Sequence, residues 1–464
     1  MAENDASTEV DPERGGDDAY GLSARAVARI MQAVDTGDRA LLLRESEPLH
    51  AADIADLLEQ VNASDRHRLI ALFGKDFDGD VLAELDESIR EDVLATLSPD
   101  VLATAVRDLE SDDVVDLVED LERDQQDAIL DALEDSDRAA VEQSLTYPEY
   151  SAGRLMQREV VMAPEHWSVG DAIDYLRNHD DLPEQFYHII LVDPRLHPVG
   201  NVTLGRIMAA RRDTPLKDLV EETFHLFKVT DDEADVAYAF NQYHLISAPV
   251  VDEDERLVGM ITIDDAMTVL DEEHEEDILR LGGVGEGSIA DPVLGTSKRR
   301  IVWLVVNLGT AVLASVVISQ FEETIAKLVA LAVLMPIVAS MGGNAGTQSL
   351  TVAVRALATK DLTRSNTWRF ILREGAVGLI NGLALAIPLG LATGALFASA
   401  PLGAVIAAAL IINIFAAALS GTLVPIVLDK LGIDPALGSG VLVTTVTDVV
   451  GFFAFLGLAA LVLQ

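Results

Sequence analysis

The 464-residue chain contains no cysteine, and only 7 of its 33 cationic residues are lysine. Without cysteine, the chain can form neither a disulfide framework nor a thiolate metal site. Its N-terminus, MAENDASTEVDPERGG, lacks both a basic start and an apolar run, so we expect no secretory signal there. We predict instead that residues 1–20 form a disordered acidic tail.

Positively charged residues are scarce relative to acidic ones in residues 1–297 but not in residues 298–464. Residues 298–464 hold 10 Lys and Arg against 7 Asp and Glu, a net charge of +3. This leaves 23 against 70, a net charge of −47, for residues 1–297. The chain is nevertheless 50% hydrophobic, with a mean hydropathy of +0.27. These values predict a water-facing half and a lipid-facing half, and the length allows several domains.

The acidic residues are spread over the whole water-facing half. This distribution is typical of a protein that works in a high-salt cytoplasm, where salt screens the repulsion between like charges. We therefore expect a halophilic source. The same composition weakens any inference from an acidic cluster alone to a metal site.

Apolar runs long enough to cross a bilayer begin at Ile301 and predict an all-α transmembrane domain over residues 298–464. The expected five spans are at about 301–320, 325–356, 371–398, 402–428 and 436–462. Basic residues 298–300 precede the first span, whereas the connection after it carries Glu322 and Glu323. Because basic loops stay inside, we expect a multi-pass cell-membrane protein with a cytoplasmic N-terminal half and its C-terminus outside.

One carboxylate, Asp448, falls in the middle of the last span, where its charge costs roughly 2.5–3.5 kcal/mol to bury. Thr444 and Thr445 lie one turn before it and Gly451 lies a turn beyond, which predicts a polar stripe on one helix face. The span holds no cation to pair with Asp448, so we expect its partner to be a translocated cation. In a homodimer with its axis along the pore, two Asp448 carboxylates would attract a dication. A structural Asp bonded to a neighbouring helix is the alternative.

The chemistry of the spans favours a hard cation. They contain no histidine, which argues against soft metals. Hydrated Mg²⁺ is typically held through one or two carboxylates while it keeps several waters.

The second span contains the polar segment MPIVASMGGNAGTQSL. Close packing of helices through small residues would explain its glycines. The amide oxygens beside a locally loosened backbone favour a polar path. We therefore expect the second and fifth helices to be interrupted, and the segment to line the same path as Asp448. The candidate residues are Gly343, Asn344, Gly346 and Gln348.

The first part of the soluble half, residues 21–147, predicts a helical domain. Within residues 49–146, apolar pairs recur mostly at roughly 12-residue steps, separated by Asp-rich turns such as SPD, ESDD and EDSD. Asp and Ser in these turns are expected to cap the following helices. The repetition indicates a helical solenoid.

Two stretches of β–α alternation follow, at 148–220 and 221–270. The second contains an Asp-capped helix, the strands SAPVVD and LVGMITI, and a helix that starts at Asp264. The first repeats this order with HIILVDPRLHPVGNVTLGRIM. The two strongly resemble a tandem CBS pair, a ligand-sensing module without catalytic groups. Residues 271–297 then predict an acidic amphipathic connecting helix, for which a solvated linker is the alternative.

The order of these parts, together with YPEYSAGRLM, GGNAGTQ and DPALGSG…TTVTDVVG, resembles the MgtE family of magnesium channels over residues 49–464. The resemblance implies a cytosolic helical solenoid plus an α/β tandem CBS pair, followed by an all-α five-helix transmembrane domain. It implies a homodimeric, Mg²⁺-selective channel in membrane lipid, closed by cytosolic Mg²⁺ on the N and CBS domains, and neither an enzyme nor a nucleic-acid binder. Some relatives also bind ATP at the CBS pair, so ATP is a candidate ligand.

The resemblance also implies particular metal ligands. The pore aspartate of the family falls on Asp448. Two sensor positions depart from the family pattern, with His244 and Thr268 where aspartates are expected. The matching cytosolic ligands are Asp232, Asp265, Glu273, Glu276 and Asp277.

Three other functions fit parts of the pattern. An ion-coupled secondary transporter of divalent cations also uses a midplane acid and broken helices, although the spans show no inverted repeat. An intramembrane aspartyl protease needs two carboxylates that share a proton, and each chain offers one deep Asp. A nucleotide sensor that only regulates a partner would leave the polar stripe unexplained.

Overall fold

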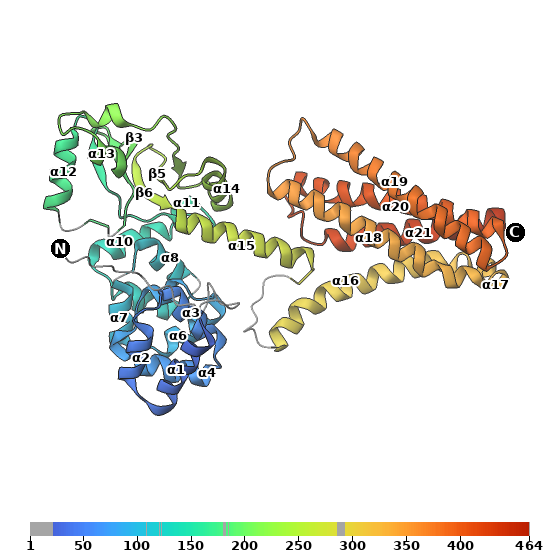
Figure 1. Ribbon diagram of the computed structural model, residues 1–464, viewed down its shortest axis with the longest axis horizontal. Helices are drawn as coiled ribbons and strands as arrows, with labels where there is room; N and C mark the ends of the chain where they lie inside the picture. The colour runs from blue at the N-terminus through green and yellow to red at the C-terminus, as the bar shows by residue number, and fades with distance from the viewer. Residues whose placement is uncertain are drawn as a thin grey trace, which may run out of the picture. The chain divides into compact units, whose positions relative to one another are not determined.

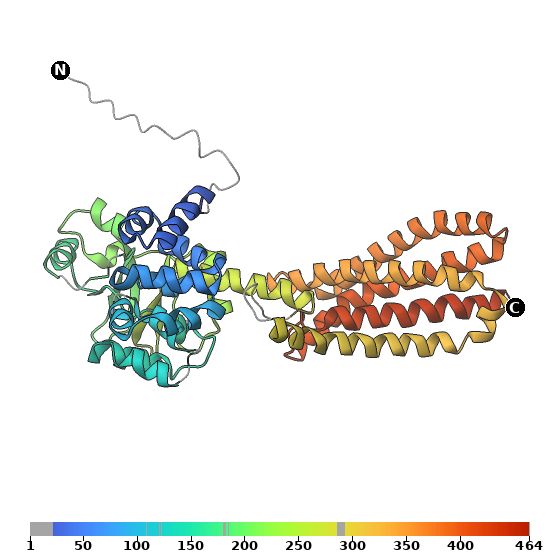
Figure 2. The same ribbon diagram turned by 90° about the horizontal axis from the view of Figure 1, so that it is seen from below.

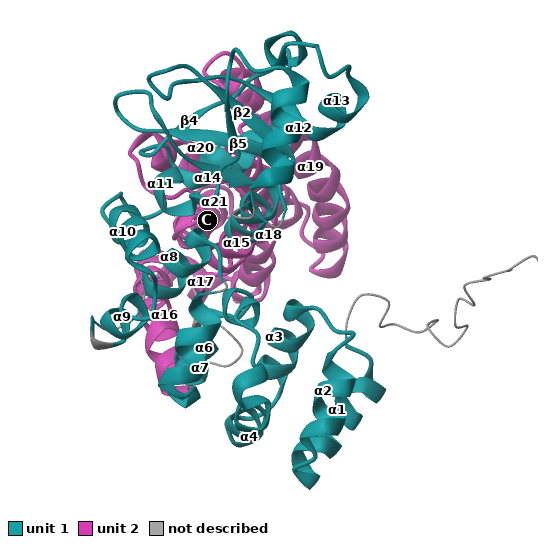
Figure 3. Ribbon diagram, turned by 90° about the vertical axis from the view of Figure 1, so that its left-hand side faces the viewer, with its two compact units in different colours: residues 1–273 teal, residues 274–464 magenta. Residues whose placement is uncertain are grey.

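The computed structural model describes residues 22–107, 109–119, 121, 123–179, 182–183, 185–284 and 293–463. The tail predicted at 1–20 and the part of the predicted connecting helix at 285–292 lie outside the described residues. The chain divides into two compact units, residues 1–273 and residues 274–464 (Figure 3).

Unit 1 begins with a succession of short helices, blue to cyan in Figure 1. These are α1 (Ala24–Thr36), α2 (Arg39–Ser46), α3 (Ala51–Gln60), α4 (Ala63–Phe73), α5 (Asp80–Ala83), α6 (Glu87–Thr96), α7 (Pro99–Arg107), α8 (Ser111–Glu119), α9 (Arg123–Leu130) and α10 (Asp135–Ser144), with a 3-10 turn at Gly74–Asp76. Their apolar faces share one buried core that runs from Ile30 in α1 to Val141 in α10. Helices this short are marginal alone in water, so the shared core stabilises them. The predicted helical domain is confirmed.

Side-chain caps fix several of the helix starts. The Ser23 side chain accepts a hydrogen bond from the first turn of α1, and His50 and Asp53 form a reciprocal capping box at α3. At α10 the N-cap residue is Glu134, whose side chain makes no capping bond, so the Asp or Ser cap expected in the EDSD turn is wrong. The helix starts at Asp135, so the short acidic side chains lie in its first turn. There their negative charge interacts favourably with the positive end of the helix dipole.

The second part of unit 1 is a pair of three-stranded sheets with the same topology. Its elements are α11 (Ala152–Leu155), β1 (Met162–Pro164), α12 (Val169–Asn178), β2 (His188–Val192), β3 (Pro198–Thr203), α13 (Leu204–Ala209), a 3-10 turn at Leu216–Leu219, β4 (Phe227–Lys228), α14 (Glu233–Tyr243), β5 (Ser247–Val251) and β6 (Leu257–Thr262). In each sheet the central strand pairs in parallel with the first strand and antiparallel with the third. His188 lies opposite Thr203, and Ser247 lies opposite Thr262 at the corresponding place. The predicted tandem repeat is therefore confirmed.

The helix α15 (Ile263–Leu281) follows β6 directly. It continues through residue 271, so no separate helix begins at the expected connecting segment. Its residues up to 273 belong to unit 1, and those from 274 belong to unit 2.

Unit 2 contains five helices that are long and apolar enough to cross a membrane, counted over the described residues. They are α16 (Val293–Ser319), α18 (Ala330–Ala358), α19 (Thr367–Leu396), α20 (Ala400–Lys430) and α21 (Ser439–Val462), with the short α17 (Glu322–Lys327) between the first two. Figures 1 and 2 show α18 to α21 side by side, and α20 is the most buried of them. Both α18 and α21 are continuous, so the expected interruptions are wrong. Glycines keep helical geometry where neighbouring helices pack closely against them.

Candidate functional site

The polar stripe predicted on the last span lies on α21. Thr444, Thr445 and Asp448 are all half-buried in the single chain. The Thr444 hydroxyl donates to the carbonyls of Gly440 and Val441 at 3.0 Å, and Thr445 Oγ1 donates to Val441 O at 2.6 Å. Each hydroxyl uses its hydrogen in these bonds, so its oxygen can still accept. Among the described residues, no hydrogen bond or ion pair joins Asp448 to another side chain.

The next face of α21 is buried against α18 and α20. Val443, Thr447 and Gly451 lie on this face, one turn apart. A β-carbon built on Gly346 of α18 would lie 2.6 Å from Val443 Cγ1 and 3.4 Å from Thr447 Cγ2. The structure therefore gives Gly346 and Gly451 a role in helix packing, and their position on the polar path stays a prediction.

The remaining candidates on α18 point away from this packing. Asn344 and Gln348 are exposed, and Gly343 is half-buried with no atom within 4 Å of a built β-carbon. No hydrogen bond to the Asp448 carboxylate from these amides occurs within the described part of the chain. Their place on the path stays a prediction.

Sequence reasoning missed two buried polar side chains in the membrane helices. Glu374 lies inside α19, where Ser349 Oγ approaches its Oε2 at 3.5 Å. Asn413 is wholly buried in α20 and donates from Nδ2 to Val338 O at 2.8 Å. The signal available for Asn413 was a single amide within the apolar run LIINIFAA. Glu374 follows basic residues in the sequence, so it is not recognisable there as a residue of the helix interior.

In unit 1, Asp265 at the start of α15 joins carboxylates from the start of α8. We call Glu110, Asp112, Asp113 and Asp265 the first acidic cluster. Burial, followed by repulsion from neighbouring carboxylates, raises the pKa of Glu110 and of Asp113 to about 7. Burial also raises the pKa of Asp265 to about 6 and that of Asp112 above its ordinary value, and these two carboxyls share a hydrogen bond.

Hydrogen bonds hold α8 against the segment that leads into β1. Ser111 Oγ donates to Glu159 Oε2 at 2.8 Å and accepts from the Arg158 N–H at 2.8 Å. Gln157 Nε2 donates to Glu110 Oε2 at 3.1 Å. The helical part and the two-sheet part of unit 1 therefore meet at the first acidic cluster.

A second acidic cluster surrounds the start of α14. Its members are Glu119, Asp232, Glu233, Glu272 and Glu273. Burial raises the pKa of Glu233 to about 7, with a further contribution from Glu272 and Glu119. Asp232 also caps α14, because its Oδ1 accepts from the Asp235 N–H at 3.3 Å. One oxygen of this predicted ligand is therefore already bonded.

The predicted ligands Glu276 and Asp277 belong to unit 2, whereas the other three predicted cytosolic ligands belong to unit 1. Arg280 forms an ion pair with Glu276 and donates to Asp434 Oδ2 at 2.7 Å. Burial, and then Asp434, raises the pKa of Asp277. Leu281 packs on buried residues of the membrane helices, so the end of α15 is attached to them.

Within the described residues, no three or more His, Cys, Asp or Glu side chains converge closely enough to hold a metal ion. Mg²⁺ does not require such a set, because it keeps several waters and uses one or two carboxylates. Carboxylates that repel one another, as in both acidic clusters of unit 1, are neutralised by either protons or cations. The donor set therefore fits Mg²⁺ held partly through water.

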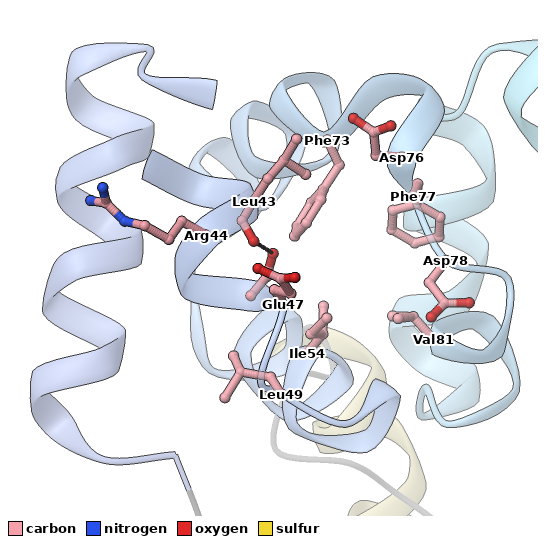
Figure 4. Close-up of a pocket in the computed structure, with 11 residues that line it drawn as sticks. Leu43, Arg44, Glu47, Leu49, Ile54, Phe73, Asp76, Phe77, Asp78 and Val81 are labelled. Carbon is pink, nitrogen blue, oxygen red and sulfur yellow. Dashed lines mark hydrogen bonds between the residues drawn. The ribbon is translucent and has the colours of Figure 1, made fainter. Parts of the chain in front are cut away.

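A separate pocket of about 480 Å³ lies in the helical domain (Figure 4). Phe73, Leu43 and Ile54 form part of its apolar wall, and Asp76 and Asp78 also line it. No residue predicted from the sequence as a site residue belongs to it.

Five helices long and apolar enough to cross a membrane, one of them with a carboxylate that has no described partner, and a second part rich in clustered acids are features expected of a multi-pass transporter of divalent cations. The family model described as a divalent cation transporter, MgtE, matches residues 335–458. The MgtE intracellular N domain matches residues 49–150, and the CBS domain matches residues 152–213 and 213–272. The chain belongs to the MgtE family of magnesium transporters.

Individual relatives agree with this assignment. The magnesium transporter MgtE of Enterococcus faecalis is 34% identical over 324 residues, which is 70% of this chain and 72% of that one. The magnesium transporter MgtE of Thermus thermophilus is 34% identical over 332 residues, 70% of this chain and 73% of that one. These relatives are transporters, not enzymes.

Two solved structures are similar to about half of this chain. The cytosolic domain of the Mg²⁺ channel MgtE in complex with ATP is 28% identical and covers 53% of this chain and 100% of that one, with a TM-score of 0.49. The soluble part of a magnesium transporter is 25% identical and covers 54% of this chain and 98% of that one, with a TM-score of 0.48.

Proposed function

We propose that this chain forms a homodimeric, Mg²⁺-selective channel for magnesium uptake, with Asp448 in the ion path. The observation that carries the proposal is the Asp448 carboxylate, which lies in the middle of a membrane helix without a partner among the described side chains. Such a charge is costly in a bilayer unless it faces water, an ion or another subunit. A cation in transit meets this requirement.

A second copy of the chain completes the path. Each chain supplies one Asp448 on a half-buried face, flanked by the hydroxyls of Thr444 and Thr445. Two such faces opposed across a two-fold axis place two carboxylates and four hydroxyls around one ion. Two carboxylates with retained water suit Mg²⁺.

The acidic clusters provide the gate. Without a dication, the carboxylates of the first and second acidic clusters repel one another, which favours separation of the domains. Mg²⁺ binds the compact arrangement more tightly and shifts the population toward it. Because α15 carries Asp265 at one end and Leu281 at the other, compaction acts on the helix that is attached to the membrane unit. Cytosolic Mg²⁺ would thereby close the channel.

An ion-coupled secondary transporter of divalent cations is the second candidate, because a midplane acid serves both mechanisms. In either case the soluble domains lie in the cytoplasm and the C-terminus lies outside. ATP is a candidate ligand of the CBS pair, and radiolabelled ATP binding to the purified chain tests it. Strong acidity also suits a halophilic cytoplasm.

Mg²⁺ uptake by proteoliposomes containing the Asp448→Asn variant tests the function. The amide is neutral and easier to bury but offers no charge, so we expect most uptake to be lost while the protein stays folded. Glu322→Gln, an exposed acid at the start of α17, is the matched charge control and should transport as the parent does. Parental uptake by Asp448→Asn would refute the proposal.

A further inference from the structure

Asn413 occupies an unusual position in the membrane unit. It lies in the interior of α20 and is completely buried. Its Nδ2 donates to Val338 O of α18 at 2.8 Å, and its Oδ1 has no hydrogen-bond partner among the described residues. A buried amide inside a membrane bundle is costly unless its bonds are made, so this side chain carries a specific constraint.

Two glycines make room for this amide. A β-carbon built on Gly342 of α18 would lie 2.1 Å from Asn413 Nδ2, and one built on Gly451 of α21 would lie 2.6 Å from the same atom. Neither distance is compatible with a side chain. The amide is therefore enclosed by the two helices that carry the family motifs, GGNAGTQ and TTVTDVVG.

The enclosure lies close to Asp448 along the helix. Gly451 follows Asp448 by three residues, which is about 4.5 Å along the axis. Thr447, on the same buried face as Gly451, directly precedes Asp448 and so lies about 100° from it around the helix. Any rotation or sliding of α21 against Asn413 therefore moves the Asp448 carboxylate.

We propose that Asn413 is a positioning residue for ion transport: its amide fixes the rotation and depth of α21 against α18, and so holds Asp448 at the ion path. The inference rests on the proposed role of Asp448. A single buried polar residue sets helix register in the same way in coiled coils.

The ion most sensitive to this geometry is Mg²⁺. It demands near-ideal octahedral coordination, whereas Ca²⁺ accepts variable numbers and directions of ligands. A displaced Asp448 carboxylate therefore impairs Mg²⁺ passage more than Ca²⁺ passage. The ratio of the two fluxes reports position, whereas a loss of stability lowers both fluxes in proportion to the folded protein.

The test compares full-length Asn413→Ala with the parent in proteoliposomes, with Mg²⁺ and Ca²⁺ uptake measured per folded protein. We expect the Mg²⁺ to Ca²⁺ ratio to fall about three- to eighteenfold, the factors that correspond to the measured range for one hydrogen bond between membrane helices. Thr422→Val is the matched control, because Thr422 is equally buried in α20 but its hydroxyl donates, among the described residues, to Ala418 O of its own helix at 2.7 Å. It should keep the parental ratio.

A second variant separates the hydrogen bond from simple filling of space. Combining Gly451→Ala with Asn413→Ala puts a methyl group where the amide was, which should restore folding if Asn413→Ala alone is unstable. The Val338 carbonyl still lacks the additional bond from the Asn413 amide, so we expect the flux ratio to stay low. A parental ratio in either Asn413→Ala or the double variant would overturn the positioning role.

Asp448→Asn, measured in parallel, separates the two proposals. If it transports as the parent does, the proposed function fails, whatever the ratio in the Asn413 variants. If it loses uptake while Asn413→Ala keeps the parental ratio, only the positioning role fails.

Discussion

The first acidic cluster should make the stability of the protein depend on pH in a defined direction. Glu110 and Asp113 both have a native pKa of about 7, whereas carboxyls of the unfolded chain ionise near pH 4. Between about pH 4 and pH 7 the native state therefore binds more protons than the unfolded state. The free energy of unfolding accordingly rises as the pH falls from 8 to 6. The ionised carboxylates of Glu110 and Asp113 destabilise the native state fully above pH 7, and this destabilisation disappears below about pH 4.

The size of this effect follows from the two pKa values. One group with a pKa of about 7 changes the free energy by about 1.4 kcal/mol between pH 8 and pH 6, and two groups by about 2.7 kcal/mol. Because both carboxyls retain some contact with solvent, we halve the sum to about 1.4 kcal/mol. For a domain of about 150–250 residues, this raises the melting temperature by about 3–6 °C.

Mg²⁺ should replace the protons. Differential scanning fluorimetry of the full-length chain, at constant KCl, should show a larger stabilisation by Mg²⁺ at pH 8 than at pH 6. The double variant Glu110→Gln/Asp113→Asn should lose most of both the pH step and the Mg²⁺ step at pH 8. Glu91→Gln/Asp100→Asn removes two exposed carboxylates from α6 and α7 and should behave as the parent. A parental pH step in the cluster variant would refute the reasoning.

Three further predictions concern other parts of the chain. Gly346→Leu should prevent folding of the membrane unit because the leucine side chain would meet Val443, whereas Gly343→Leu should fold and lose uptake. Size-exclusion profiles report folding and flux assays report uptake. Full uptake by Gly343→Leu would exclude Gly343 from the ion path. Glu276→Gln/Asp277→Asn should leave the pore open at cytosolic Mg²⁺ levels that close the parent, and unchanged inhibition in patches would place the sensor elsewhere. The melting temperature should rise between low and molar KCl, because salt screens the charge of −47 on residues 1–297, and a flat profile would contradict halophilic adaptation.

Local patterns were enough to predict the elements of the fold. Hydropathy located the membrane helices, and β–α alternation located both sheets because their central strands are short apolar runs between turn residues. Interruption of α18 was predicted wrongly, because glycine weakens an isolated helix but permits close packing in a bundle.

The candidate sites were predicted less completely. Asp448 could be identified as a candidate site residue because it is a charged residue within an otherwise apolar run of the sequence. The carboxylates of α8 could not be distinguished from the many solvated acids of this chain, since only tertiary contact with Asp265 raises their pKa. Asn413 belongs to no repeated polar pattern in the sequence. Its proposed role depends on contacts with glycines that lie far from it along the chain.

The central claim is that Asp448 lines an open, Mg²⁺-conducting channel that cytosolic Mg²⁺ closes. Single-channel recording from excised patches, with Mg²⁺ as the only permeant cation and titrated on the cytosolic face, tests it most directly. We predict discrete unitary Mg²⁺ currents in the parent, whose open probability falls as cytosolic Mg²⁺ rises, and no such currents in Asp448→Asn. Robust Mg²⁺ uptake without unitary currents, or unitary currents of parental size in Asp448→Asn, would contradict the account.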